Sequence, residues 1–291
     1  MNWVSFPGLG IGKFFISEYA FEILGIKIYY YAIIFSLAIV SGTFYAYYMS
    51  EKIGILRSKC IDIILFSLIL GIVGARLYYV IFNINEFLKD KSSIWNVVFD
   101  MLNLRSGGIA IYGGLIFAFI TGAVICKINK IKILPMLDLA GMSLLLSQAI
   151  GRWGNFFNIE AYGIKTNLPW GMMSNKIMPN LQPVHPTFFY ESVWCFIGFI
   201  LINCLFKNRK FDGELFLIYL TWYSFARFFI EDLRTDSLMF FQTNIKISQA
   251  LSLILFIVAG SLLIYFYCKF KKNKIKLYAN STAWHKILNK K

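Results

Sequence analysis

The run Gln148-Ala-Ile-Gly-Arg-Trp-Gly-Asn-Phe-Phe-Asn-Ile-Glu-Ala-Tyr-Gly163 follows directly on the apolar stretch 134–150 and puts charged and amide side chains at its end. An arginine at the middle of a bilayer costs roughly 2.5 to 3.5 kcal/mol on insertion scales, so polar groups in such a place are functional candidates. Arg152 and Asn155 are one helical turn apart, and Asn158 follows a turn later if the helix continues. Together with Glu160, they predict a site for a polar ligand.

A plainer interpretation of the same run is a capped helix end, in which each asparagine satisfies its own backbone. Three glycines favour the ligand site, because glycine lets a backbone come close to a partner or a ligand. They are Gly151, Gly154 and Gly163.

Composition places the whole chain in a membrane. Of its 291 residues 58% are hydrophobic and only 15% are charged, whereas an ordinary soluble domain is about 25% charged. A helix needs about 20 apolar residues to cross a hydrocarbon core of about 30 Å. We therefore predict an all-α polytopic membrane protein with about seven transmembrane helices, near 29–49, 61–82, 109–126, 134–150, 187–206, 215–233 and 249–268.

The distribution of Lys and Arg predicts the orientation, because cytoplasmic loops carry the excess of basic residues. Of the 29 basic residues, 17 lie in the alternate connections 52–59, 127–132 and 207–210 and in the tail after the last span. We expect these segments to be cytoplasmic, with the N-terminus and the connections 83–108, 151–186 and 234–248 outside. The net charge of +14 then reflects topology, and the tail is expected to meet anionic lipid and no nucleic acid.

These spans divide the chain into an outer-face N-terminal segment, 1–28, a transmembrane domain, 29–268, and a basic cytoplasmic tail, 269–291. Within the domain, 151–186 contains several prolines and reads as an irregular outer-face cap. No basic-then-apolar signal peptide precedes the first span, which we expect to be an uncleaved insertion signal. The cysteines show no C-x-x-C spacing, so we expect free thiols and no metal site. They are Cys60, Cys126, Cys195, Cys204 and Cys268.

Further charges lie inside or beside the predicted spans. Arg76 follows Gly71 and Gly74, which would let another backbone approach closely; it could bind a ligand or simply extend to the outer headgroups. Arg227, Glu231 and Arg234 are spaced i, i+4, i+7 and share one stripe of a helix. Alone they form an ion-pair ladder, but two cations with one anion leave a positive charge for something else to balance.

Two glycine pairs, Gly107-Gly108 and Gly113-Gly114, flank Tyr112 at the start of the third span. They are either turns or places where a lipid headgroup reaches backbone N–H groups. His185 precedes the fifth span in the run His185-Pro-Thr-Phe-Phe-Tyr-Glu191. Because planar guanidinium forks match phosphate oxygens, the combined inventory predicts a polytopic protein that binds a phosphate-bearing ligand at its outer side.

The motifs resemble those of the bacterial prolipoprotein diacylglyceryl transferases, above all Gly151-Arg-Trp-Gly-Asn-Phe-Phe-Asn-Ile-Glu160, which is similar to the family signature G-R-x-G-N-F-x-N-x-E. The supporting pieces are Gly74-Ala-Arg-Leu-Tyr-Tyr79, Gly107-Gly-Ile-Ala-Ile-Tyr-Gly-Gly-Leu115, His185-Pro-Thr-Phe-Phe-Tyr-Glu191 and Arg227-Phe-Phe-Ile-Glu-Asp-Leu-Arg234. The resemblance implies transfer of the diacylglyceryl group of phosphatidylglycerol to the lipobox cysteine of a prolipoprotein signal peptide, with release of glycerol phosphate. It implies no cofactor and a location in the bacterial cytoplasmic membrane.

The resemblance also implies roles for single residues. Arg152 would bind the lipid headgroup, Asn155 would orient it, and Arg227 would neutralise the departing phosphate, where negative charge grows. Glu231 and Arg234 would hold this constellation in place, and Tyr31 matches a family tyrosine. The further substrate-binding candidates are Asn158, Glu160, Gly163, Arg76, Tyr79, Gly107, Gly108, Gly113 and Gly114.

Tyr112 departs from the family pattern, which commonly has histidine at this position, proposed to help deprotonate the substrate thiol. A tyrosine with a pKa near 10 is a poor base at neutral pH, whereas a thiol near 8.5 is already partly ionised. Either Tyr112 positions the substrate while His185, a glutamate or water takes the proton, or catalysis relies mainly on positioning and charge. We favour the second.

Two other functions compete with the transferase. A transporter for an anionic solute would favour charges spread through the membrane depth and symmetry between the halves, but the arginines cluster toward one face and no repeat is visible. An intramembrane protease needs a Ser-His or paired-Asp arrangement, but Asp62 and Asp138 lie toward the cytoplasmic ends of unrelated spans. Oligomeric state is not predicted by the sequence.

Overall fold

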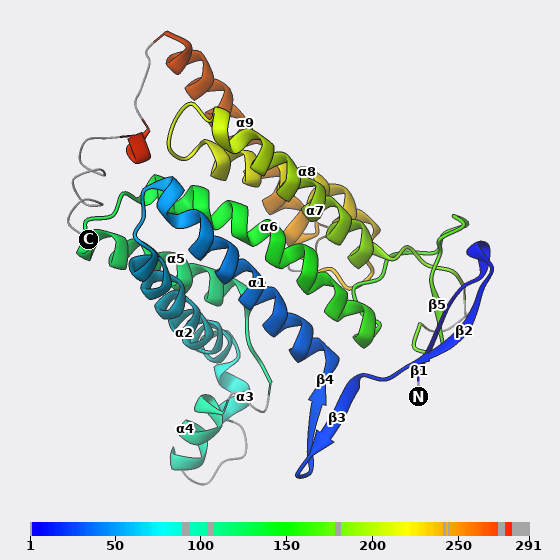
Figure 1. The fold of residues 1–291 in the computed structure, drawn as a ribbon. Helices are drawn as coiled ribbons and strands as arrows, with labels where there is room; N and C mark the ends of the chain where they lie inside the picture. Colours follow the sequence, from blue (N-terminus) through cyan, green and yellow to red (C-terminus); the bar gives the residue numbers. More distant parts are fainter. Residues whose placement is uncertain are drawn as a thin grey trace. The chain divides into compact units, whose positions relative to one another are not determined.

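The computed structural model describes residues 2–88, 94–103, 107–177, 182–240, 243, 245–272 and 277–280, and these are mostly helical (Figure 1). The chain divides into two compact units, one formed by Met1–Met49 with Leu137–Lys291 and one by Ser50–Met136. Each unit is described by itself below.

The long helices of the first unit are α1 (Tyr30–Ile53), α6 (Ile133–Asn158), α7 (Thr187–Leu205), α8 (Glu214–Leu233) and α9 (Ile247–Lys272), with short 3₁₀ turns at Pro7–Leu9, Phe206–Asn208 and Tyr278–Asn280. Helix α8 packs against both α7 and α9. Trp194 of α7 and Trp222 of α8 stack, and each indole N–H donates to the other's backbone carbonyl at 2.9 and 3.0 Å. Gly198 permits this approach, since a Cβ there would lie 2.4 Å from Trp222 Nε1.

The second unit holds α2 (Arg57–Phe82), α3 (Ile84–Leu88), α4 (Ile94–Leu102) and α5 (Ile111–Ile128). Helices α2 and α5 pack closely through small residues. A Cβ on Gly74 would lie 2.2 Å from Phe117 Cγ, and one on Gly113 would lie 2.5 Å from the carbonyl oxygen of Gly74. The predicted close approach at Gly71 and Gly74 is confirmed, as expected where membrane helices pack through small side chains.

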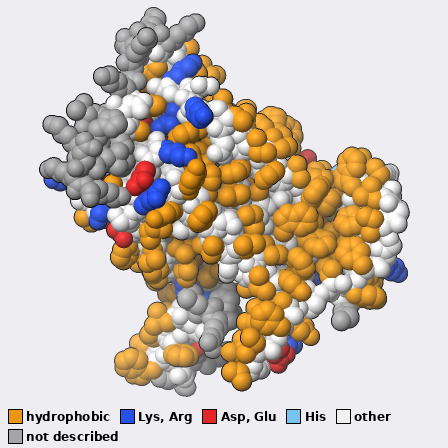
Figure 2. Space-filling view, in the orientation of Figure 1, with side chains coloured by type: hydrophobic (Ala, Val, Ile, Leu, Met, Phe, Trp, Pro, Cys, Tyr) orange, Lys and Arg blue, Asp and Glu red, His pale blue; other side chains and the backbone are white. Residues whose placement is uncertain are grey.

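A helix occupies each of the seven stretches predicted to span the membrane. In the part of the chain that the structure describes, six of these helices are long and apolar enough to cross a bilayer. The seventh, α8, is 20 residues long but carries Glu214, Arg227, Glu231 and Asp232. Apolar side chains cover much of the face shown in Figure 2. This surface suits lipid, and the chain is a mostly helical protein of the multi-pass membrane type.

The segment predicted as an irregular cap is partly helical and partly sheet. Helix α6 continues to Asn158, so the prediction of irregular structure is wrong for 151–158. Strands β1 (Asn2–Phe6), β2 (Ile11–Ile16) and β5 (Met173–Ser174) form an antiparallel sheet in the order β2-β1-β5, with Val4 opposite Ser174. The N-terminal segment and the insert, predicted separately and without strands, are therefore joined by one sheet.

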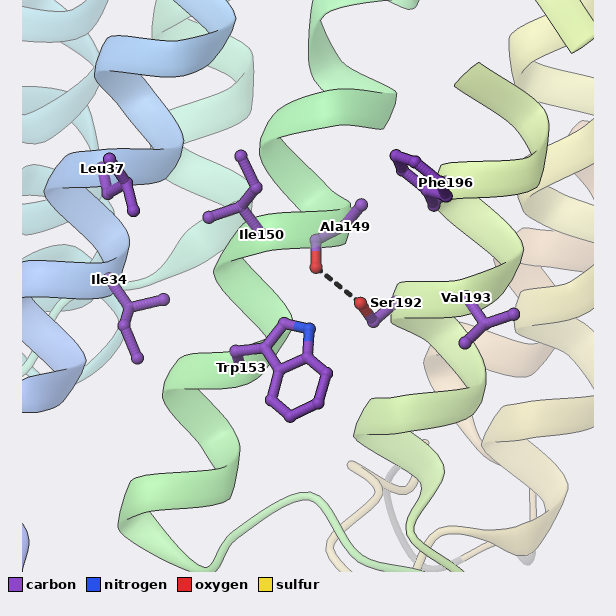
Figure 3. A pocket seen from close by; sticks show the side chains of 8 residues that line it. All are labelled: Ile34, Leu37, Ala149, Ile150, Trp153, Ser192, Val193 and Phe196. Atoms are coloured by element: carbon purple, nitrogen blue, oxygen red, sulfur yellow. Dashed lines mark hydrogen bonds between the residues drawn. The ribbon is translucent and has the colours of Figure 1, made fainter. Parts of the chain in front are cut away.

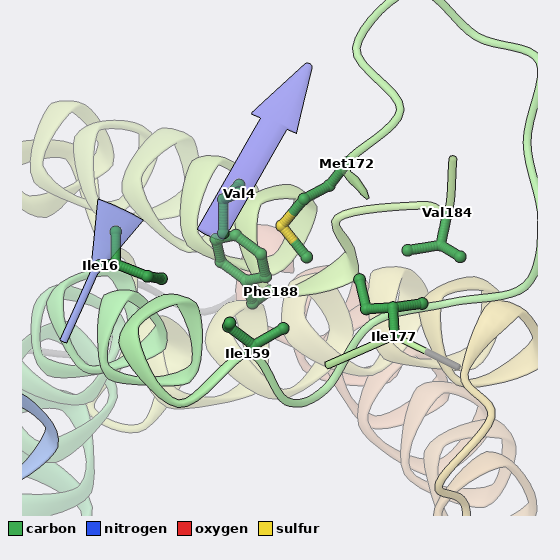
Figure 4. Packing of buried hydrophobic residues seen from close by; sticks show 7 residues of the cluster. All are labelled: Val4, Ile16, Ile159, Met172, Ile177, Val184 and Phe188. Atoms are coloured by element: carbon green, nitrogen blue, oxygen red, sulfur yellow. The ribbon is translucent and has the colours of Figure 1, made fainter. Parts of the chain in front are cut away.

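This sheet has a small hydrophobic core of its own, shown in Figure 4. Its residues come from the strands, from the loops of the insert and from the adjoining ends of α6 and α7. They are Val4, Ile16, Ile159, Met172, Ile177, Val184 and Phe188. The core fixes the chain on both sides of the polar run that ends α6, so the cap has a defined position on the helices that carry the candidate residues.

A two-stranded hairpin, β3 (Tyr19–Ile23) with β4 (Ile26–Tyr29), leads directly into α1. Its two turn residues, Leu24 and Gly25, both have positive φ, as the turns that suit the right-handed twist of a hairpin require. The five cysteines are free. Most of the predicted basic tail, at 273–276 and 281–291, and Pro179 of the insert lie outside the described residues.

Candidate active site

A buried carboxylate, Glu191, lies at the centre of the site. It is in the second turn of α7 and is only 2% exposed. Arg152 Nη2 of α6 donates to its Oε1 at 2.6 Å, and Arg227 Nη1 of α8 donates to its Oε2 at 2.9 Å. The hydroxyl of Tyr223, also on α8, donates to Oε1 at 2.7 Å. Three helices are thus joined at one carboxylate, and both guanidiniums are fixed by charge-assisted hydrogen bonds.

The predicted ion-pair ladder on α8 exists at Arg227 and Glu231, whose Nη2 and Oε2 atoms are 2.5 Å apart. Arg234 follows the last residue of the helix and forms a two-pronged pair with Asp236, at 2.9 and 2.8 Å. Burial works to raise the pKa of Asp236, but the hydrogen bond and the charge of Arg234, with smaller contributions, together outweigh it, and the pKa lies below its ordinary value. The end of α8 is further held by Lys246, whose Nζ donates to the carbonyl oxygens of residues 231, 232 and 234.

The amides of the polar run converge on Glu160. Asn155 Nδ2 donates to its Oε1 at 2.8 Å, Asn158 Nδ2 donates to the same oxygen at 3.3 Å, and the Glu160 N–H donates to the carbonyl of Asn155 at 3.0 Å. Ile159 and Ala161 on either side have φ of +51° and +53°. A β-branched residue there is an outlier, and such strain is typical of functional sites. The hydrogen bonds of both asparagine side chains thus go to the Glu160 carboxylate, which favours the polar cluster over the capped helix end in which each asparagine satisfies its own backbone.

The first helix of this unit contributes Tyr31. Its ring covers Gly154, where a Cβ would lie 2.9 Å from Tyr31 Cδ2, and the neighbouring Tyr30 stacks on Phe157 with ring centroids 4.5 Å apart. The structure thus brings Tyr31 onto the helical turn between Arg152 and Asn155.

His185 and Gly163 lie where the cap joins α7 and α8. His185 Nδ1 is 3.1 Å from the hydroxyl of Tyr190, which also accepts a hydrogen bond from Trp170. Burial lowers the pKa of His185 below its ordinary value. Gly163 donates its N–H to the carbonyl of His185 at 2.8 Å, and a Cβ on it would lie 2.9 Å from the carbonyl oxygen of Leu233. Close packing of three segments accounts for this glycine.

In the second unit, Arg76 of α2 is buried and donates to backbone carbonyls. Its Nε binds Met101 at 2.9 Å, its Nη2 binds Asp100 at 2.7 Å, and its Nη1 binds Gly107 and, at 2.8 Å, Gly108. The guanidinium thus joins the end of α4 to the loop before α5 and does not simply extend to lipid headgroups. Tyr79 lies beside it, with the Arg76 guanidinium 5.7 Å from the centre of its ring.

The two glycine pairs have different structures. Gly107 and Gly108 have φ of +79° and +72° and form the loop held by Arg76. Gly113 and Gly114 lie in the first turns of α5 and face α2, and the N–H of Gly114 donates to the carbonyl of Ala110. The first pair is explained by the turn and the second by helix packing. Tyr112, partly exposed, lies between them at the start of α5.

Two residues of this site, Glu191 and Tyr223, were not predicted from the sequence. The signal for Glu191 was present, since it is an ionisable residue inside an apolar span and such residues are functional candidates by default. The positive charge expected to need an outside anion is balanced by this carboxylate.

Comparison with known proteins matches residues 18–265 to the family model described as prolipoprotein diacylglyceryl transferase. The chain belongs to this family. Proteins named phosphatidylglycerol–prolipoprotein diacylglyceryl transferase are 41% identical over 255 residues in Clostridioides difficile, 43% over 258 in Finegoldia magna and 39% over 265 in Staphylococcus aureus. These matches cover 88% of this chain and 96%, 97% and 91% of the relatives.

Every candidate site residue, from Tyr31 to Arg234, lies within the matched range. The Glu191 cluster is therefore part of the transferase region of the chain. Strands β1 and β2, which end at Phe6 and Ile16, precede that range.

Proposed function

We propose that this protein transfers the diacylglyceryl group of phosphatidylglycerol to the lipobox cysteine of prolipoproteins, the first step of lipoprotein maturation. Membership of the transferase family and the names of the relatives support the reaction. The observation that carries it to particular residues is the pair of guanidiniums, Arg152 and Arg227, held by one buried carboxylate between three helices.

The reaction forms a bond between the cysteine sulfur and a glyceryl carbon and breaks the bond from that carbon to the phosphate oxygen. The electron pair leaves with glycerol phosphate, so negative charge grows on the phosphate. Fixed guanidiniums stabilise such charge better in the transition state than before it, and they do so without reorganising. The Glu191 cluster provides two guanidiniums that are held in fixed positions.

Accessibility separates the two guanidiniums. The Arg152 side chain is 23% exposed, the Arg227 side chain 13%, and that of Glu191 only 3%. We assign the headgroup phosphate to Arg152. Asn155, one turn further along α6, and Glu160, just beyond the end of that helix, orient the glycerol hydroxyls. Arg227 supports the leaving phosphate, and Tyr31 closes this side of the site over Gly154.

The cluster does not contain an obvious base for the thiol proton. Glu191 accepts from two arginines and a tyrosine, so both of its oxygens are already engaged. His185 is kept largely neutral at pH 7 and is held by Tyr190 in the cap. We therefore keep positioning and charge as the main source of catalysis, with the already ionised fraction of the thiol as the nucleophile.

We place the enzyme in the bacterial cytoplasmic membrane with the site toward the outer face. The basic connections and tail support this orientation, because cytoplasmic segments carry the excess of Lys and Arg. The sheet of β1, β2 and β5 then lies outside, where a prolipoprotein signal peptide emerges.

The test is a reaction in liposomes that contain the purified protein, phosphatidylglycerol and a lipobox peptide. We expect a thioether-linked diacylglyceryl peptide and an equal amount of glycerol phosphate, and neither product with a peptide whose cysteine is replaced by serine. If the protein binds phosphatidylglycerol but forms neither product, the proposal is refuted.

A second test asks whether the fork geometry of Arg152 is used. Arg152→Lys keeps the charge but removes the planar donors, so we expect turnover to fall by about tenfold or more, since one charge-assisted contact contributes roughly 1.5 to 3 kcal/mol. The matched control is Arg57→Lys on α2, whose guanidinium lies in a partly exposed pair with Glu51. Equal turnover by both variants would argue against bidentate phosphate binding.

A further inference from the structure

An apolar groove lies between α1, α6 and α7, and Figure 3 shows the side chains that line it. Its volume is about 450 Å³, within the size range of small-molecule sites. The lining residues are Ile34, Leu37, Ala149, Ile150, Trp153, Ser192, Val193 and Phe196. The rim is open toward the lipid side of the helices, because Leu37, Val193 and Phe196 are 54%, 40% and 51% exposed.

The groove contains almost no polar surface. Ser192 has the only polar side chain on its walls besides the Trp153 indole, and its hydroxyl donates to the backbone carbonyl of Ala149 at 2.6 Å. That contact satisfies both groups and joins α6 to α7 at the groove floor. A hydrocarbon chain suits such an apolar lining because it has no polar groups to pair. A polar ligand would find no hydrogen-bond partners on these walls and would leave its own polar groups unpaired.

The groove adjoins the Glu191 cluster along two helices at once. Trp153 directly follows Arg152 on α6, and Ser192 directly follows Glu191 on α7. The groove and the cluster thus lie on the same turns of the same two helices, a placement that suits one molecule with an anionic head and an apolar chain. We propose that this groove holds an acyl chain of the phosphatidylglycerol whose phosphate binds Arg152, and that its walls set the acyl-chain preference. This inference rests on the proposed function and adds a chain subsite to it.

The expected energetics differ from those of a pocket in water. Surrounding lipid tails are as apolar as the groove, so the hydrophobic effect gives no preference for the groove. Discrimination between acyl chains must come from packing, in which each single carbon–carbon contact is weak. We therefore expect the preference between chain lengths to change by roughly two- to fivefold when the walls are altered, as the sum of a few such contacts.

The test is a competition between phosphatidylglycerols with long and short acyl chains, mixed in the same liposomes with a lipobox peptide. Val193→Trp narrows the groove and should shift product toward the short chain, and Phe196→Ala widens it and should shift product toward the long chain. Matched controls are Ile200→Trp and Ile197→Ala, exposed positions on the same helix that do not line the groove. They should keep the wild-type ratio.

A binding measurement makes the inference testable without turnover. Phosphatidylglycerol with a photoreactive group in the middle of one acyl chain should label peptides from α6 and α7 that line the groove. Unlabelled phosphatidylglycerol should suppress this labelling more than an equal amount of phosphatidylcholine does, since only the first carries the substrate headgroup.

The possible outcomes separate the two proposals. Wild-type protein that forms no thioether product refutes the proposed function, and the labelling result still decides whether the groove binds the lipid. Product with the same chain ratio in Val193→Trp, Phe196→Ala and wild type overturns the groove alone. Labelling that both lipids suppress equally also overturns it, because the groove is then filled by bulk lipid.

Discussion

Replacement of Glu191 by glutamine is the sharpest test of the site. The substitution keeps the size and planarity of the side chain and removes its charge. Arg152 and Arg227 then share a neutral amide, whose single oxygen replaces the two that now accept from them at 2.6 and 2.9 Å. Tyr223 also loses its charged acceptor.

The magnitude follows from burial. Removal of one partner from a buried ion pair typically costs about 3 to 5 kcal/mol, because the remaining charge is left without compensation. Glu191 is 2% exposed, so water cannot replace the lost carboxylate. For a chain of this size such a loss lowers the unfolding midpoint by roughly 10 °C. The comparison is Glu18→Gln, which removes a pair with Lys176 whose side chains are 39% and 45% exposed and which contributes about 0 to 1 kcal/mol.

The assay is thermal unfolding in one detergent at one protein concentration, followed by transfer activity of the folded fraction. We expect Glu191→Gln to unfold far below Glu18→Gln and to lose activity at least as deeply as Arg152→Ala. The double variant Arg152→Gln/Glu191→Gln should be less destabilised than the sum of the single changes, because each removes the charge that the other leaves unpaired. Equal midpoints for Glu191→Gln and Glu18→Gln, or additive single effects, would refute the central role of this carboxylate.

Three further predictions concern residues around the cluster. Tyr112→Phe should retain measurable transfer, since we assign it no base role; a loss as deep as that of Arg152→Ala would contradict this. Burial lowers the pKa of His185 in the folded protein, so neutral His185 contributes stability above about pH 6.5, and this contribution is lost as the pH falls through the folded-state pKa. The unfolding midpoint of the wild type should therefore fall from pH 7.5 to pH 5.5. The midpoint of His185→Gln should fall by less over the same range. Gly163→Ala should cost about 1 to 3 kcal/mol of stability by overpacking against the Leu233 carbonyl, measured by urea or thermal unfolding beside an exposed control, Gly12→Ala.

The helical part of the fold was predictable because lipid imposes simple requirements. A spanning helix needs length and low charge, and both are visible in one sequence. All seven predicted stretches are helical. The sheet was not predictable in the same way, since β5 has two residues and pairs with a strand about 170 positions earlier in the chain. Such pairing depends on the small core around Met172 and Phe188, which no local pattern reveals.

The sequence predicts the residues of the site within each helix, but it does not predict the contacts that connect the helices. Local spacing placed Arg152 with Asn155, and Arg227 with Glu231, because residues three and four apart share a helix face. The contact that joins the two groups is provided by a third helix through Glu191. Arg76 shows the reverse case, since its charge suggested a ligand but its donors go to carbonyls of its own unit.

The geometry also indicates different roles for Arg152 and Arg227: the first as a phosphate ligand and the second as a structural ion pair. Arg152 pairs with Glu191, which is its carboxylate partner among the described residues, and its side chain is the more exposed. If a phosphate replaces that contact, Glu191 keeps its bonds to Arg227 and Tyr223, so no buried charge is left unpaired. Arg227 bridges Glu191 and Glu231, and moving it would break the ion pairs of two buried carboxylates at once.

Arg152→Lys should therefore raise the KM for phosphatidylglycerol with a small change in unfolding midpoint. Arg227→Lys should lower the midpoint by several degrees, because a single ammonium replaces a fork that now holds two buried carboxylates. Parallel measurement of both quantities on both variants tests the assignment. The opposite pattern, in which Arg152→Lys is the less stable variant and Arg227→Lys has the higher KM, would show that Arg227 is the exchangeable ligand and Arg152 the structural one.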